Sequence, residues 1–349
     1  MSAGVAGASN GTVTFSNDIN PPATTSFDIS YVDNSRGSYF LADRTNKAVD
    51  LIDAKTGTFT GSIQGGFQGA TNSRATSGPN GVLDDSAGLV WAGDGNSTIK
   101  VLNPTPGANL IKSIPTGGTK RADELSYDPA DQVILIANDF EGFLTFINVK
   151  TQSVATHFYY GDNTVGQPAT VSGHSTAGGG IEQSVWDPKT GLFYQAVPAC
   201  STPPPDGTCK PVTTGFIDVF SPSGSLVKTY SVPGCTNGPT GLALGKNSYL
   251  MGACDNGGAV VEVGSGHVRT IVSGVGGADE VWFNPGDGNF YFGISGTTAP
   301  ELGVVNGDNA HLVTTISGHG GHSVAAYAGN NHIFDPEKSG SGIAVFASS

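Results

Sequence analysis

The chain is predicted to be an all-β protein: a seven-bladed β-propeller of four-stranded blades, forming a single domain over residues 1–349. Three observations lead to this fold class. A hairpin-like unit, clearest from Tyr39 to Gly57, returns in variant form at intervals of roughly 40 to 60 residues, as in repeat architectures. The chain has 52 glycines and 20 prolines, which suits short strands joined by tight turns. A spare strand over about residues 11–16 precedes the first unit.

The best-preserved unit joins two β-rich runs across a polar turn. Residues 39–42 and 48–53 are the two runs, and Thr56-Gly57 forms the turn that follows them. A hairpin of this size cannot bury an apolar face alone, so neighbouring copies must cover it. The unit therefore predicts a ring or stack of similar blades.

Seven segments combine a Gly- or Pro-rich lead with an alternating strand, and each is predicted to open a blade. The blades are expected to begin near residues 28, 80, 124, 182, 240, 280 and 322. Third strands are expected at 49–53, 99–103, 144–148, 216–220 and 260–263. Their alternation of apolar and polar residues predicts strands with one covered face.

The two ends of the chain are expected to meet. After His322 only three good strand candidates remain, and the last of them covers residues 342–346. The N-terminal strand at about 11–16 would then complete the last blade and remove the open edge of the ring.

The repeat resembles the YVTN/YncE-like group of seven-bladed propellers, most strongly between Tyr39 and Ile63. The matching positions are Asn46, Val49, Ile52, Asp53, Thr56 and Gly57. This resemblance implies the architecture and often implies export. It implies little about activity, because propellers serve as enzymes, ligand binders and interaction platforms alike.

The charge and hydropathy of the chain narrow the choice of partners. A net charge of −13 disfavours nonspecific attraction to nucleic acid or to an anionic membrane, since both are negative themselves. No apolar run approaches the length that crosses a bilayer, so no membrane span is expected. Neutral or cationic ligands, or a metal ion, fit better.

Four cysteines occur as two local pairs, Cys200 with Cys209 and Cys235 with Cys254. Local pairing in two disulfides is the natural proposal, although three connectivities are formally open and four buried thiols are the alternative. Disulfides favour a secreted or periplasmic protein. The start of the chain lacks a signal peptide. We therefore expect either a mature exported form or a cytosolic protein in which the disulfide prediction fails.

The candidate functional residues lie where blade starts depart from the family pattern. The usual Pro-x-Gly lead is present at Pro79-Asn80-Gly81 and Pro239-Thr240-Gly241, whereas other blades begin with acids or histidines. These departures are Asp123, Glu124, Glu182, Asp279, Glu280, His319 and His322, with His174 shortly before Glu182. If they converge on one channel mouth, they could bind a ligand, hold one divalent metal ion, activate water or shuttle protons. The alternative is that they bond backbone amides and solvate a water-filled channel.

Two functions follow from this set. The first is an exported propeller that binds a small molecule or a protein partner at the acidic, histidine-lined channel face. The second, by analogy with streptogramin lyases and lactonases, is a metal-assisted lyase or lactone/ester hydrolase. In that case Glu124, Glu182, Glu280 and His322 would be the metal or water ligands, and His174, His319 or His322 the general base. Asp94, Asp139 and Asp255 are expected only to cap turns.

Overall fold

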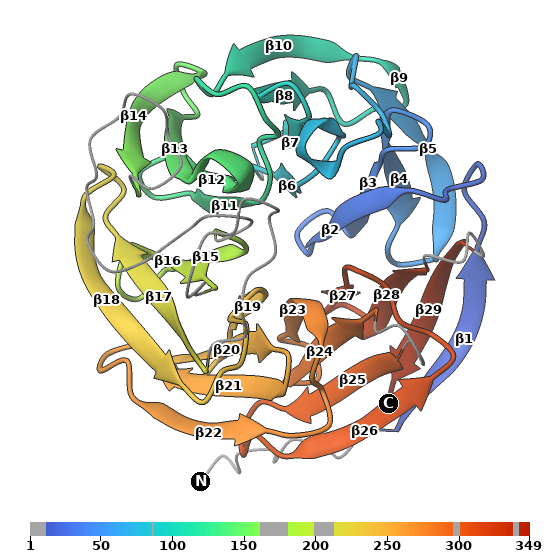
Figure 1. Cartoon of the computed structure of the whole chain (residues 1–349). Helices are drawn as coiled ribbons and strands as arrows, with labels where there is room; N and C mark the ends of the chain where they lie inside the picture. The colour runs from blue at the N-terminus through green and yellow to red at the C-terminus, as the bar shows by residue number, and fades with distance from the viewer. Residues whose placement is uncertain (1–11, 86, 161–180, 199–212, 296–300, 338–341) are drawn as a thin grey trace, which may run out of the picture.

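Seven antiparallel sheets stand around a central axis as the blades of a β-propeller (Figure 1). The protein is represented by a computed structural model that describes residues 12–85, 87–160, 181–198, 213–295, 301–337 and 342–349. The predicted fold class is confirmed.

Each blade takes its four strands from one stretch of chain, except the last. Blade one contains β2 (Phe27–Asp33), β3 (Ser38–Asp43), β4 (Ala48–Asp53) and β5 (Thr58–Gln64). Blade two contains β6 (Val82–Asp84), β7 (Val90–Asp94), β8 (Thr98–Leu102) and β10 (Leu110–Pro115). Blade three contains β11 (Leu125–Asp128), β12 (Val133–Asn138), β13 (Phe143–Asn148) and β14 (Ser153–Tyr159). Blade four contains β15 (Ser184–Asp187), β16 (Leu192–Val197), β17 (Thr214–Phe220) and β18 (Leu226–Pro233). Blade five contains β19 (Leu242–Leu244), β20 (Tyr249–Cys254), β21 (Gly257–Glu262) and β22 (Val268–Val272). Blade six contains β23 (Ala278–Asn284), β24 (Asn289–Ile294), β25 (Glu301–Asn306) and β26 (Leu312–Ser317). Blade seven contains β27 (Ala325–Tyr327), β28 (His332–Glu337), β29 (Gly342–Ser348) and β1 (Val13–Ile19).

Two short 3₁₀ helices and one extra strand complete the described elements. The helices are η1 (Arg74–Thr76) and η2 (Asp139–Glu141), and β9 (Gly107–Ala108) adds a parallel fifth strand beside β5. No helix among the described residues is long and apolar enough to cross a membrane.

The predicted hairpin at Tyr39 to Gly57 forms β3 and β4, paired in register from Ser38 opposite Asp53. Its side chains are covered on both faces, whereas the alternating pattern predicted one covered face. Tyr39 packs toward Phe334 of blade seven, and the next residue, Phe40, packs into the cluster shared with blade two. Each blade is sandwiched between two neighbours, which is why the prediction of one covered face was wrong.

The apolar core lies between the blades rather than at the axis. Each of the seven hydrophobic clusters in the described chain joins two adjacent blades, and together they follow the whole ring. The first strand of each blade contacts the first strand of the next, from β2 around to β27 and back to β2. The loops that lead into these first strands therefore meet near the axis, as predicted.

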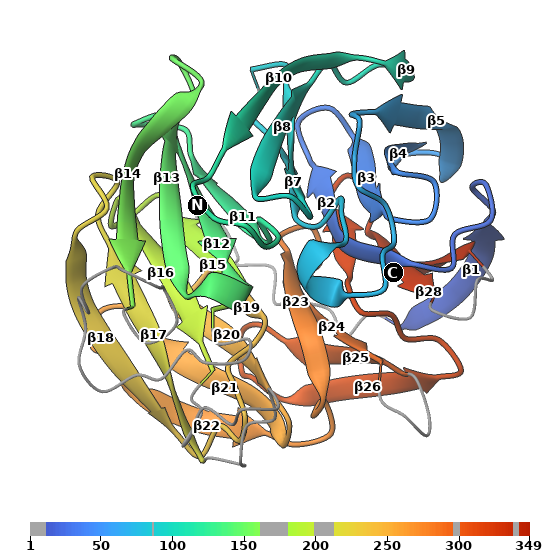
Figure 2. The same cartoon turned by 45° about the horizontal axis from the view of Figure 1, so that its top comes forward.

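The ring closes through its two ends. β1 pairs antiparallel with β29, from Val13 opposite Ser348 to Ile19 opposite Ile343, and so forms the outer strand of blade seven. Figures 1 and 2 both place β1 along the outer rim, beside the last strands of the chain. The predicted closure is confirmed, although the strand begins and ends somewhat later than residues 11–16.

Candidate functional site

The loops and strand ends that open the blades bring acids and one histidine to a single small cavity on the axis. Its walls include the predicted residues Asp123, Glu124, Glu182, Asp279, Glu280 and His322. Asp28 of β2 and two arginines, Arg74 and Arg121, also line it. We call this the channel cavity. The predicted convergence of the blade starts therefore exists for these six residues.

A repeated backbone arrangement positions two of the acidic pairs. Residues Ala122-Asp123-Glu124 open blade three, and the same three residue types, Ala278-Asp279-Glu280, open blade six. The Asn80 amide donates to the carbonyl of Ala122 over 2.9 Å, and the Thr240 hydroxyl donates to the carbonyl of Ala278 over 3.2 Å. The Pro-x-Gly leads of blades two and five thus each fix the acidic loop of the following blade.

The glycines of those leads allow the close approach. A Cβ on Gly81 would lie 2.3 Å from the carbonyl oxygen of Asp123, and one on Gly241 would lie 2.6 Å from that of Asp279. Contacts this short between heavy atoms are repulsive, so only glycine lets the neighbouring loop lie flat against the lead. The Pro-x-Gly leads, which keep the usual pattern, thus hold the acidic loops in place.

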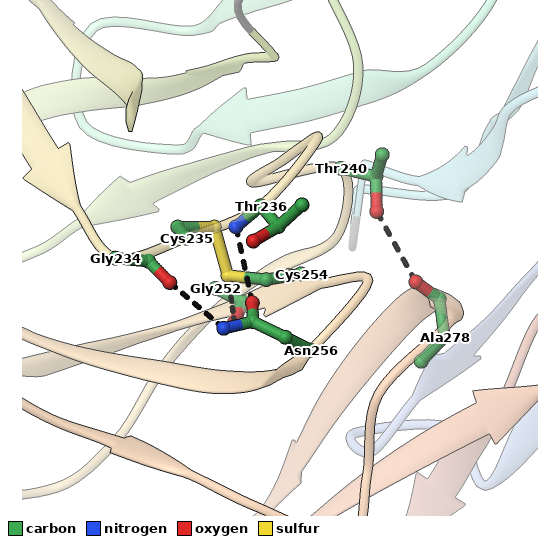
Figure 3. Close-up of a disulfide and its surroundings, with 8 residues drawn as sticks. All are labelled: Gly234, Cys235, Thr236, Thr240, Gly252, Cys254, Asn256 and Ala278. Carbon is green, nitrogen blue, oxygen red and sulfur yellow. Dashed lines mark hydrogen bonds between the residues drawn. A yellow bond between two sulfur atoms is a disulfide. The ribbon is translucent and has the colours of Figure 1, made fainter. Parts of the chain in front are cut away.

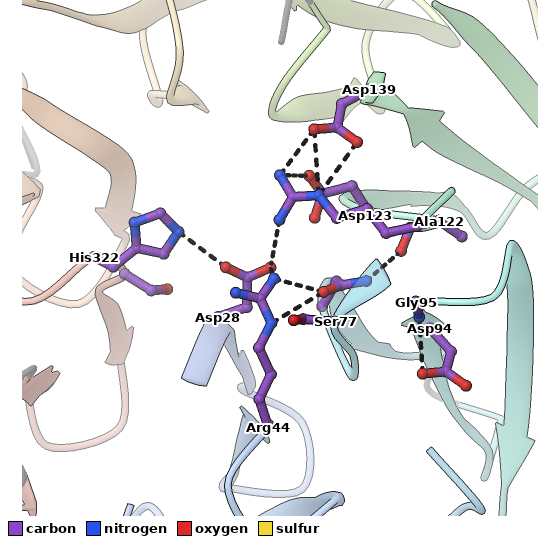
Figure 4. Close-up of polar contacts among 12 residues, drawn as sticks. Asp28, Arg44, Ser77, Asp94, Gly95, Ala122, Asp123, Asp139 and His322 are labelled. Carbon is purple, nitrogen blue, oxygen red and sulfur yellow. Dashed lines mark hydrogen bonds and ion pairs between the residues drawn. The ribbon is translucent and has the colours of Figure 1, made fainter. Parts of the chain in front are cut away.

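Arg121 is the central buried cation of the site. Its guanidinium contacts Asp123 at 2.5 Å, Asp139 at 2.8 Å and Asp28 at 3.4 Å, and its side chain is 4% exposed. Figure 4 labels the three carboxylates, Asp28, Asp123 and Asp139. Burial alone would lower the pKa of Arg121, but the three carboxylates raise it well above the ordinary value. Arg121 is thus a permanent positive charge that neutralises part of an acidic cluster.

Asp28 joins this arginine to the rest of the site. Arg44 donates to Asp28 and, over 2.5 Å, to the amide oxygen of Asn80 in the next blade. His322 contacts the other oxygen of Asp28 at 3.0 Å. Although burial alone would raise it, Arg44, His322 and Arg121 hold the pKa of Asp28 well below its usual range. Asp28 is therefore ionised and ties blades one, two, three and seven together.

His322 bridges two carboxylates and is protonated. Its Nε2 lies 3.0 Å from Asp28 and its Nδ1 lies 2.7 Å from Asp279, so both ring nitrogens act as donors. Burial opposes the charge, but Asp279 and Asp28 raise the pKa of His322 to about 10. Because an imidazolium has no free lone pair, this histidine can act neither as a metal ligand nor as a general base in this state.

Glu124 and Glu280 meet through a hydrogen bond between their carboxyl groups, although they belong to blades three and six. Burial, together with Glu280 and Glu182, raises the pKa of Glu124 well above its ordinary value. Burial and Asp279 raise the pKa of Glu280 to about 8, and the hydrogen bond from Glu124 works in the opposite direction. Glu124 is therefore the donor and Glu280 the acceptor of this hydrogen bond, and both pKa shifts favour the protonated carboxyl groups. The second oxygen of Glu280 is buried without a hydrogen-bond partner.

A larger pocket of about 450 Å³ opens beside the channel cavity. The two spaces are adjacent, because four residues line both of them: Asp28, Arg74, Asp279 and His322. We call the larger space the mouth pocket. Arg74 on η1 is exposed and forms no ion pair with any described residue, and the Asp279 side chain is 33% exposed. The mouth pocket thus presents one free cationic group and one partly free carboxylate.

The predicted metal site is not supported by the residues described. No group of three or more His, Cys, Asp or Glu side chains in the described ranges is arranged to hold a metal ion. His322 commits both nitrogens to carboxylates, and Glu124 shares a proton with Glu280. Arg121 further pairs with one oxygen of Asp123 and with Asp139, so these two carboxylates already share a cation.

Two other predicted residues do not join the site. His319 stacks on Phe15 of β1 at a centroid separation of 4.7 Å and contacts Glu337 at 2.5 Å, and it lines neither the channel cavity nor the mouth pocket. The prediction that both histidines of Gly318–His322 face the channel is therefore wrong for His319. His174 lies outside the described residues.

The cysteine prediction is confirmed where it can be followed. Cys235 and Cys254 form a disulfide with a Cα separation of 5.3 Å, and both are buried between blades four and five (Figure 3). Asn256 adds bonds to the carbonyl of Gly234 and to the amide of Thr236, which closes the same turn. Cys200 and Cys209 lie outside the described residues.

Sequence reasoning missed the cationic half of the site and assigned one acid differently. Arg44, Arg74 and Arg121 were not singled out, and Asp139 was expected only to cap a turn. Asp139 instead binds Arg121. One signal was available for Arg121, which lies directly before the first Ala-Asp-Glu triplet.

Comparison with known proteins adds no family assignment. The chain matches no protein-family model, and no curated protein sequence is significantly similar to it. The YVTN/YncE-like relationship therefore remains a prediction, and the fold itself is the firm result.

Proposed function

We propose that the protein binds a small polar molecule, neutral or cationic overall, in the mouth pocket at the end of the channel cavity. The observation that carries this proposal is the pair of charged groups left available there. Arg74 has no ionic partner among the described residues, and Asp279 keeps part of its carboxylate exposed. A ligand with both donor and acceptor groups would satisfy the two.

The rest of the pocket wall is preorganised for such a ligand. Asp28, Arg44 and His322 are held by one another and by neighbouring blades through short charge-assisted bonds. Side chains locked in this way lose little freedom when a ligand binds, which strengthens binding for a given set of contacts. A fixed polar wall with one free and one partly free charged group supports a binding role.

A small molecule fits the site better than a protein partner. The large apolar side chains exposed among the described residues are Phe15, Leu110, Ile111, Val227 and Leu312. They lie on β1, β10, β18 and β26, which are outer strands, and not at the mouth pocket. A protein interface normally centres on buried apolar anchors, and the described residues offer none there.

Export is part of the same proposal. The Cys235–Cys254 disulfide supports a mature protein in an oxidising compartment, secreted or periplasmic. We do not extend the proposal to a metal-assisted lyase or hydrolase, because the described side chains do not assemble a three-ligand site. The proposed role is ligand binding at the mouth pocket.

A ligand screen with pocket variants tests the proposal. Amino acids, monoamines, sugars and small carboxylates at millimolar concentration would be compared for their effect on the thermal midpoint. Some compounds should stabilise the wild type and the surface control Arg269→Gln, while Arg74→Gln and Asp279→Asn bind them at least tenfold more weakly. The proposal fails if no compound stabilises the protein, or if binding is the same in both pocket variants.

A further inference from the structure

We propose, building on the proposed function, that the ligand is a primary monoamine whose ammonium group occupies the channel cavity between Glu280 and Asp123. The body of the ligand would lie in the mouth pocket, and its charged end would point along the axis. This names the class of ligand and adds a second, deeper subsite to the one at Arg74 and Asp279.

Two buried oxygen atoms in the channel cavity lack partners. Oε2 of Glu280 and Oδ1 of Asp123 accept no hydrogen bond, and each residue is only 2% exposed. Leaving a buried acceptor unsatisfied costs about 1 to 3 kcal/mol, and more for a charged one. Both residues line the same cavity, so one small donor placed there can satisfy both.

Charge selects an ammonium as that donor. The side chain of Glu182 also lines the cavity and has no hydrogen bond or ion pair with any described residue. Burial and Asp279 raise the pKa of this carboxyl well above its ordinary value, so a cation beside it would favour its ionised form. An ammonium carries three N–H donors and a positive charge, which matches two or three carboxylate oxygens. A neutral hydroxyl would supply a single donor and no charge.

Size excludes the larger cations. The channel cavity measures about 10 Å³, which is room for one water-sized group. A primary ammonium group has that size. A quaternary ammonium, with four carbon substituents, and a planar guanidinium, with three nitrogen atoms, are both too large for it. The cavity should therefore discriminate among cations by shape as well as by charge.

The positive groups around the mouth pocket limit the ligand to one positive charge. Arg44, Arg74 and the protonated His322 all line it. A second positive charge on the ligand would lie beside these groups and be repelled. A monoamine with a neutral or carboxylate-bearing body satisfies both subsites, and a polyamine does not.

A size series of cations tests this inference on the intact protein. Propylammonium chloride should raise the thermal midpoint at pH 7.5 above that in sodium chloride of equal ionic strength, and tetramethylammonium chloride should not. Calorimetric titration of propylammonium should show at least tenfold weaker binding to Glu280→Gln and to Asp123→Asn. The surface variant Glu262→Gln, whose side chain bonds Ser265, should bind like the wild type.

Equal effects of the two organic cations, or unchanged affinity in Glu280→Gln, would overturn the inference. If that variant does not fold, the cation series on the wild type decides the question alone. A sugar or another neutral compound that binds in an Arg74-dependent way, without any response to propylammonium, would refute the ammonium subsite and leave the proposed function standing. A protein that responds to no compound of either series refutes both.

Discussion

Replacing His322 by glutamine should destabilise the protein strongly at neutral pH and hardly at all in alkali. The imidazolium of His322 joins Asp28 of blade one to Asp279 of blade six, at 3.0 Å and 2.7 Å. Glutamine preserves much of the volume and can donate a hydrogen bond, but it cannot carry the charge. The loss therefore reports the electrostatic part of this junction between three blades.

The magnitude follows from the proton affinity of the histidine. Its pKa is about 10 in the folded protein, against the ordinary value of 6.5. A raised pKa stabilises the fold fully below pH 6.5, and this stabilisation is lost as the pH rises through 10. Linkage gives about 4 kcal/mol at pH 7 and less than about 0.5 kcal/mol at pH 10.5, as upper estimates.

Urea unfolding at the two pH values measures this difference. The gap in unfolding free energy between wild type and His322→Gln should close by several kcal/mol between pH 7 and pH 10.5. His311→Gln, which alters an exposed side chain away from the channel cavity, is the matched control and should show no gap. A gap of equal size at both pH values would show that the charge of His322 does not stabilise the ring.

Two further changes test the other supports of the site. Replacing Cys235 and Cys254 by alanine opens a loop of sequence separation 19 and should cost roughly 3 kcal/mol in urea unfolding; an unfolding midpoint that dithiothreitol leaves unchanged in the wild type would contradict this. Arg121→Met leaves the carboxylates that surround the arginine without their cation and should cost about 3 to 5 kcal/mol. A loss below about 1 kcal/mol, no larger than that of the surface variant Arg269→Met, would mean that the carboxylates take up protons instead.

The fold could be predicted because its information is local. The run from Tyr39 to Gly57 contains both strands of a hairpin and its turn, and the remaining blades repeat this with variation. The closing strand could be inferred by counting strands after His322. The burial of both faces of the middle strands was missed. The alternation of apolar and polar residues in these strands indicated one covered face, but a neighbouring blade covers each of the two faces.

The acidic half of the site was predictable for a different reason. Asp123, Glu124 and Asp279 stand where a propeller places its channel, so their position followed from the fold alone. Their cationic partners depend on distances between blades. Arg44 reaches Asn80 in the next blade and Asp28 near the axis, and nothing in the local pattern records those contacts.

His319 and His322 illustrate the limit of reasoning from spacing. The two residues lie in one short glycine-rich segment, and the sequence treats them alike. In the structure, one lies against the outer strand β1 and the other against the axis. Their different partners depend on how the blades pack, which no property of the two residues themselves indicates.

The pairing of β1 with β29 determines when the ring can close during synthesis. β1 leaves the ribosome long before its partner β29, because the strands of the first six blades lie between them in the sequence. Until then, blade seven cannot be completed and β1 remains an unpaired strand that another chain can bind. The edge of β29 can pair equally well with β1 of the same molecule or with β1 of a second molecule. Nascent chains at high concentration should therefore exchange their β1 strands and form domain-swapped rings. Slow, dilute synthesis should favour rings that close on themselves.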